Sequence, residues 1–174
     1  MIIKKRKLFF DYEKEEKWLN EMAAEGFNFV KYTFGTYHFE EGKKGEYYYR
    51  IQLLDQVADH QESKEYINFM EDNGVECVYT FLRWGYFRKR KEEGTFEIYS
   101  DYESRIKHYK NIATLIGTVG AMNIIVGAFN MTLSTINLYL SSVSWLTALI
   151  LTPVFLTYLN KVKKLKKEQE LYHK

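Results

Sequence analysis

Hydrophobic and polar residues alternate in short segments over the first hundred residues, and one long apolar stretch follows. Short apolar runs predict strands within 4–10, 27–34, 37–39, 47–53, 75–82, 84–90 and 95–99. Two segments with apolar positions three and four residues apart, at about 12–25 and 61–73, predict helices. From residue 111 to residue 160 there is no Asp, Glu, Lys or Arg. The pattern predicts an α+β domain followed by a separate apolar segment.

The first helix has clear signals at both ends. Asp11 is a suitable N-cap, and Gly26 is placed to end the helix. Adjacent helical positions point apart, so Glu15 and Glu16 are expected to be solvated rather than to act as an acid/base pair. The predicted buried stripe consists of Trp18, Leu19, Met22 and Ala23.

The second helix is predicted to begin at a capping box and to end at Gly74. Asp59 and Glu62 have the three-residue spacing of such a box. Its inward positions are predicted to be Tyr66, Phe69 and Met70. The order strand, helix, strand, strand, helix, strand predicts a ferredoxin-like split βαβ arrangement, and 84–90 with 95–99 predicts a C-terminal hairpin extension.

The charge-free stretch is long enough for two membrane spans. A helix needs about 20 apolar residues to cross a bilayer core, which places the spans at about 111–132 and 139–160. The α+β domain then covers 1–100, a helical stalk covers 101–110, and a tail covers 161–174. Ser100 and Glu103 resemble a capping box, which predicts that the stalk runs directly into the first span.

Charge predicts the orientation of these spans. The tail has six lysines and two glutamates, a net charge of +4, within a chain whose formal net charge is +2. Lysines next to spans stay in the cytoplasm, so both termini are predicted to be cytoplasmic. Two buried core helices of a soluble protein are the alternative, but they would normally have charged outer faces. The orienting lysines are Lys161, Lys163, Lys164, Lys166 and Lys167.

Small residues mark one face of the first span. Such residues let a second helix approach closely. The second span of the same chain is the simplest partner, and a homo-oligomer is the alternative. The predicted packing residues are Ala113, Gly117, Gly120 and Ala121.

A basic run mixed with aromatic residues follows Leu82. Its cations are expected to contact lipid headgroups or a protein partner, and a plain solvated strand is the alternative. Nucleic acid is not expected as a partner, because residues 1–110 carry a net charge of −2 and lack an RNA-recognition signature. The candidate contacts are Arg83, Arg88, Lys89, Arg90 and Lys91.

Side chains suited to catalysis or metal binding are scattered. The four histidines have no partner at metal-ligand spacing, and no nucleotide-binding or hydrolase motif is present. Cys77 is the only cysteine, so no disulfide forms within the chain. The sequence therefore predicts no enzyme, catalytic residue, metal or cofactor.

Several segments resemble a bacterial domain-of-unknown-function family, number twenty-eight-twelve. They are KEEKWLNEMAAEGF at 14–27, YHF at 37–39, GEYYYR at 45–50, WGYFR at 84–88 and FEIYSD at 96–101. The resemblance implies a bacterial cytoplasmic-membrane protein, often encoded beside a PadR-type transcriptional regulator, with no established activity. The expected function is a membrane-tethered sensor or adaptor that binds a protein partner. The alternative is a small subunit of a transport or antimicrobial-resistance complex.

Overall fold

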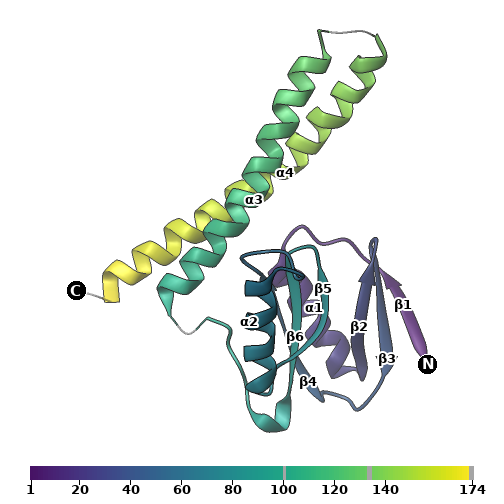
Figure 1. Ribbon diagram of the computed structural model, residues 1–174, viewed down its shortest axis with the longest axis vertical. Helices are drawn as coiled ribbons and strands as arrows, with labels where there is room; N and C mark the ends of the chain where they lie inside the picture. The colour runs from purple at the N-terminus through teal and green to yellow at the C-terminus, as the bar shows by residue number, and fades with distance from the viewer. Residues whose placement is uncertain (100, 133–134, 173–174) are drawn as a thin grey trace. The chain divides into compact units, whose positions relative to one another are not determined.

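The computed structural model describes residues 1–99, 101–132 and 135–172. The chain divides into two compact units, Met1–Ile98 and Tyr99–Lys174, which we call the α+β domain and the helical hairpin (Figure 1). Ser100 of the predicted capping box, 133–134 of the predicted turn and 173–174 of the predicted tail lie outside the described residues.

The α+β domain contains two antiparallel sheets, and the predicted mixed α+β class is confirmed. One sheet has the order β1-β3-β2, from β1 (Ile2–Arg6), β2 (Phe27–Thr33) and β3 (Thr36–Glu41). The other has the order β4-β6-β5, from β4 (Tyr47–Leu53), β5 (Glu76–Phe81) and β6 (Trp84–Arg90). A ferredoxin-like arrangement would join its strands in one sheet, so that finer prediction is not confirmed.

Local signals place α1 (Tyr12–Ala24) where the sequence predicts it. The Asp11 carboxylate accepts a hydrogen bond from the Glu13 amide at 3.0 Å, as an N-cap does. Gly26 follows the helix with φ +94°, which an L side chain rarely adopts. The first strand differs from the prediction over 4–10. It ends at Arg6, because its backbone pairs with β3 over Thr36–Glu40.

The second helix, α2 (Gln61–Asp72), begins as predicted but has a different cap. His60 is the N-cap and its Nδ1 accepts from the Glu62 amide at 3.4 Å, so the prediction of an Asp59 capping box is wrong. Met70 is buried, whereas Phe69 is 60% exposed and does not face inward. The burial of α2 covers a narrower stripe than the apolar pattern predicts.

The predicted extension 95–99 is not a strand. After β6 the chain forms a short 3₁₀ helix (Lys91–Glu93), and 94–99 has irregular backbone. Phe96 and Ile98 instead pack against a second small core around Leu54 and Phe87. Arg50 fixes this segment, since its guanidinium donates to Glu97 at 2.7 Å.

Aromatic rings fill the space between the two sheets. Phe29 is 0% exposed and lies at the centre of this core. Its ring contacts rings from both sheets, those of Tyr37, Phe39, Tyr49, Tyr79 and Tyr86. The high aromatic content is therefore largely explained by the core that joins the sheets.

The helical hairpin consists of α3 (Tyr102–Asn130) and α4 (Thr135–Tyr172), which lie side by side (Figure 1). Asp101 caps α3 by accepting from the Ser104 amide at 2.8 Å, one residue later than the predicted cap. α3 continues without a break through the predicted stalk. Both helices are long and apolar enough to cross a membrane. Within the most apolar 18-residue stretch of each helix, only 17% is buried.

Candidate functional site: the apolar hairpin, the basic strand and a buried carboxylate pair

The outward surface of the helical hairpin is apolar. Large side chains more than 40% exposed come from both helices, which argues against two buried helices of a soluble protein. Water would have to hydrate this whole surface in a soluble protein, whereas a bilayer would cover it. These side chains include Val119, Met122, Ile124, Ile125, Val126, Phe129, Leu140, Val143, Leu146, Leu149 and Leu156.

Glycine lets α3 and α4 approach closely at two places. A Cβ atom on Gly117 would lie 2.9 Å from Cε2 of Phe155, and one on Gly127 would lie 3.1 Å from Nε1 of Trp145. The Gly127 carbonyl also accepts a hydrogen bond from Ser141 at 2.7 Å. The sequence did not predict Gly127 as a packing residue, although Gly127 lies seven residues, or one heptad, after Gly120.

The predicted small-residue face only partly matches this contact. Ala113 is buried, four residues before Gly117. Gly120 is more loosely packed, since a Cβ there would lie 4.0 Å from Cβ of Leu151. Ala121 is exposed. The packed face thus runs through positions 113, 117, 120 and 127.

The predicted orienting lysines lie in the C-terminal part of α4. Lys161 stacks over the rings of Tyr109 and Tyr158, at 5.6 and 4.8 Å from their centroids. Lys164 lies 3.8 Å from Glu168, one turn further along. The others, Lys163, Lys166 and Lys167, are exposed.

The cations of the basic run lie on or beside β6, and several contact neighbouring groups. Arg88 donates two hydrogen bonds to Glu76, at 2.7 and 2.9 Å, and lies over the ring of Tyr47. Arg83 donates through Nε to the Leu54 carbonyl at 2.9 Å. These two guanidinium groups hold β6 against β5 and against the end of β4.

The remaining cations of the run lie near the other end of β6. Arg90 donates to Glu92 at 3.3 Å, and Lys91 lies 4.7 Å from the ring centroid of Tyr48. Lys89 is half-buried. Because several charges have protein partners, the capacity of β6 to attract an external anion is smaller than its composition suggests.

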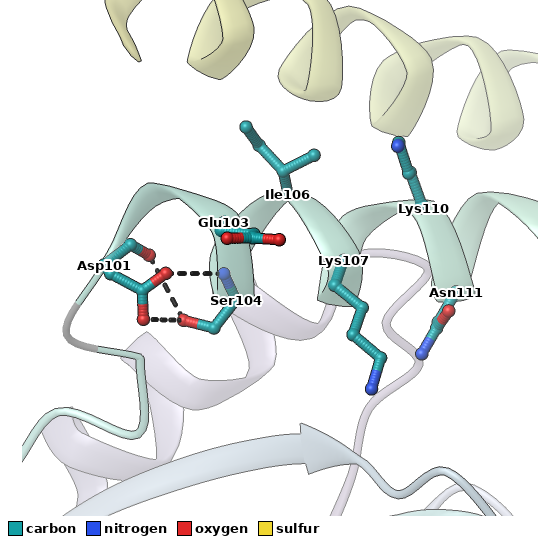
Figure 2. Close-up of a pocket in the computed structure, with 7 residues that line it drawn as sticks. All are labelled: Asp101, Glu103, Ser104, Ile106, Lys107, Lys110 and Asn111. Atoms are coloured by element: carbon teal, nitrogen blue, oxygen red, sulfur yellow. Dashed lines mark hydrogen bonds between the residues drawn. The ribbon is translucent and has the colours of Figure 1, made fainter. Parts of the chain in front are cut away.

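A shallow groove of about 560 Å³ runs along the first turns of α3 (Figure 2). The Asp101 carboxylate accepts from both the amide and the hydroxyl of Ser104, so it serves as a helix cap. Among the described residues no three His, Cys, Asp or Glu side chains could hold a metal ion. The groove is lined by Asp101, Glu103, Ser104, Ile106, Lys107, Lys110 and Asn111.

Glu15 and Glu16 are part of the domain interior, so the prediction that they are solvated is wrong. The Glu15 carboxylate accepts from the hydroxyls of Tyr37 and Tyr86, both at 2.8 Å. The Glu16 carboxylate accepts from the Ile51 amide at 2.8 Å. The two side chains do point apart, but each points into a contact between α1 and a sheet.

Burial makes these carboxyl groups favour the protonated form. It raises the pKa of Glu16 to about 7, although the Ile51 amide and Arg50 act in the opposite direction. Burial also raises the pKa of Glu15. The pKa of Glu16 therefore lies within the range in which cells operate.

We expect the α+β domain to lose stability as the pH rises. Since the pKa of Glu16 in the folded state is above its ordinary value of 4.5, its stabilising effect is complete below about pH 4.5 and lost near pH 7. The loss should be about 2–3 kcal/mol for a side chain that is 21% exposed. Urea unfolding at several pH values measures this loss.

Glu16→Gln should reduce this pH dependence by more than half, because glutamine does not ionise and its carbonyl can still accept from Ile51. The control is Glu21→Gln in the same helix, where the carboxylate is 58% exposed. A wild-type unfolding free energy that is flat between pH 5 and pH 8 would contradict the assignment.

Comparison with known proteins gives one match. No curated protein and no solved structure matches the chain. The family model described as "Protein of unknown function (DUF2812)" matches residues 11–121, which include most of the α+β domain and the first two thirds of α3. The chain belongs to this family of proteins of unknown function.

Proposed function

We propose that this protein is a non-enzymatic sensor or adaptor, tethered to the bacterial cytoplasmic membrane, whose α+β domain binds a protein partner. The observation that carries the proposal is the exposed apolar surface of α3 and α4. Two helices of 29 and 38 residues exceed the length of about 20 that a bilayer core requires. Their outward side chains are of the kind that lipid chains cover.

The flanking charges support an orientation with both ends in the cytoplasm. Lys107 and Lys110 precede the apolar part of α3, and the lysines from Lys161 onward follow that of α4. Lysines at these positions favour the cytoplasmic side. Only the short connection between α3 and α4 would then reach the outer surface.

Chemical labelling tests this topology in a Cys77→Ser background. Thr132→Cys, just after α3, should react with a membrane-impermeant maleimide on intact cells. Glu170→Cys, near the end of α4, should react only after the cells are permeabilised. Labelling of Glu170→Cys on intact cells would contradict the proposed orientation, and failure of the chain to sediment with membranes after alkaline extraction would contradict the tether.

The partner proposed for the α+β domain is a PadR-type transcriptional regulator. This choice rests on the family resemblance, and a regulator held at the membrane would be removed from DNA. The candidate contact is the basic strand β6. Its Lys89 is only half-buried, so part of this side chain is accessible to a partner.

A photo-crosslinking residue at position 89 should form an adduct with the regulator in cells, and one at Met122 on the outer face of α3 should not. Adducts with membrane proteins from position 122 only would favour the alternative, a small subunit of a transport or resistance complex.

A further inference from the structure

The exposed large apolar side chains of the α+β domain gather at one end of it. Five of the eight lie where the β2–β3 and β5–β6 hairpins turn, and we call these five the hairpin-tip patch. Phe34 and Leu82, at the two tips, are 91% and 71% exposed. The patch consists of Leu8, Phe10, Phe34, Val57 and Leu82.

Contacts between separate segments bring these five residues to one end. Phe10 is two residues before Tyr12, whose ring centroid lies 5.7 Å from that of Trp84, just after the second tip. Tyr32 and Phe81, near the ends of β2 and β5, have ring centroids 5.3 Å apart, so the two hairpins turn side by side. The Lys7 amide donates to the Gly35 carbonyl at 3.1 Å, which holds Leu8 next to the first tip. The Ala58 amide donates to the Leu82 carbonyl at 3.4 Å, which holds Val57 next to the second.

Backbone conformation makes the two tip residues unusual. Phe34 has φ +42° and Leu82 has φ +55°, in the left-handed region that bulky L residues rarely occupy. Glycine or asparagine would suit these turns better. Both positions therefore hold large, exposed apolar side chains against the local preference of the backbone. Such an exception points to a role outside the fold.

We propose that the hairpin-tip patch inserts into the lipid–water interface of the membrane that α3 and α4 anchor. This inference rests on the proposed membrane tether. After β6 the chain turns back along the sheet, since Glu97 contacts Arg50 halfway along β4. Three residues separate Ile98 from α3. Nine helical residues of α3 then precede Asn111, where the first span begins. The chain between Ile98 and this span is therefore at most about 25 Å long.

So short a tether keeps the patch at a high effective concentration next to the bilayer, and a weak insertion is then sufficient. Half-buried aromatic residues lie behind the tips, with the rings of Tyr12 and Trp84 5.7 Å apart, and such residues favour the interfacial zone. Exposed charges of both signs flank the patch, Lys7 and Lys31 as well as Asp55 and Asp59. Apolar contact rather than net charge drives the insertion, which should persist in high salt.

Lipid quenching in nanodiscs tests the proposal with the purified full chain in a Cys77→Ser background. An environment-sensitive probe is attached at Phe34→Cys, Leu82→Cys or Glu41→Cys, the last being exposed at the far end of β3. Lipids with a spin label near the headgroup should quench the probes at 34 and 82 at least threefold more than the probe at 41. Quenching equal at all three positions overturns the proposal. A blue-shifted probe at 34 without lipid quenching would also overturn it, since a second copy would then cover the patch.

A probe at Ile125→Cys, on the exposed face of α3, separates this proposal from the membrane tether. Deep-label quenching at 125 without shallow-label quenching at 34 and 82 overturns the insertion alone. No quenching at 125 overturns both.

A substitution at the other tip then tests the patch without weakening the fold. Phe34→Asn creates an Asn-Gly turn that suits the observed backbone, so the unfolding midpoint should be unchanged or higher. Quenching of the probe at Leu82 should fall at least twofold, whereas Phe69→Asn on α2 should leave it unchanged. Equal quenching in the two variants overturns the role of Phe34.

Discussion

Replacing Phe29 by alanine is expected to lower the unfolding free energy of the α+β domain by about 3–5 kcal/mol. The side chain is 0% exposed, and its ring contacts rings from both sheets. Its amide also donates to the hydroxyl of Tyr49 at 3.0 Å, so a change of backbone position at 29 would leave a buried hydroxyl poorly paired. The cavity would open in the aromatic core that joins the two sheets.

Urea unfolding of the full chain in detergent measures this effect. Fluorescence of Trp18 and Trp84 reports the α+β domain if Trp145 is replaced by phenylalanine. Phe69→Ala is the matched control, because it removes the same atoms from a side chain that is 60% exposed. It should lower the unfolding free energy by less than about 1 kcal/mol. Similar losses in the two variants would show that Phe29 does not join the sheets.

Gly117→Leu is expected to push α3 and α4 apart and to lower the stability of the helical hairpin by about 1–3 kcal/mol. Even the Cβ would lie 2.9 Å from the Phe155 ring, and the leucine adds three further carbons beyond it. The Phe155 ring, or the helix that carries it, must shift to make room for these atoms. The helices would then lose contact on both sides of position 117.

Titration of the full chain with a denaturing detergent, followed by circular dichroism, measures this loss. Gly120→Leu is the matched control, since a Cβ there has its nearest neighbour at 4.0 Å, and the unfolding midpoint should shift less than half as far. If Gly120→Leu is the more disruptive variant, the observed helix contact is wrong.

Elements specified by neighbouring residues were predictable from the sequence. The cap at Asp11 and the glycine at 26 act within one turn of α1, so their effect does not depend on the rest of the chain. The strand predicted at 95–99 is absent, because a strand there would need a partner from a distant part of the chain. The apolar run 95–99 has strand-forming residues, but side chains of Asn20 and Glu16 already accept from the Tyr49 and Ile51 amides at the outer edge of β4. The run packs instead as irregular chain on the core around Leu54.

Burial was harder to predict than secondary structure. Sequence pattern placed Glu15 and Glu16 in water and Phe69 inside, and the structure reverses all three. A carboxylate enters the interior only where donors converge on it. The donors for Glu15 come from Tyr37 and Tyr86, whose positions relative to α1 depend on the folding of both sheets.

By itself the sequence determined the mixed α+β class and the two long apolar helices, because composition and short-range spacing are sufficient for both. It determined the family through the match of residues 11–121 to the family model. Only the tertiary structure decided which glycines contact α4, since helix rotation selects Gly117 and Gly127 and leaves Ala121 exposed. It also brought five apolar side chains from separate segments to one end of the domain. Such a patch has no sequence signal, because it arises where hairpins turn side by side through contacts between distant strands.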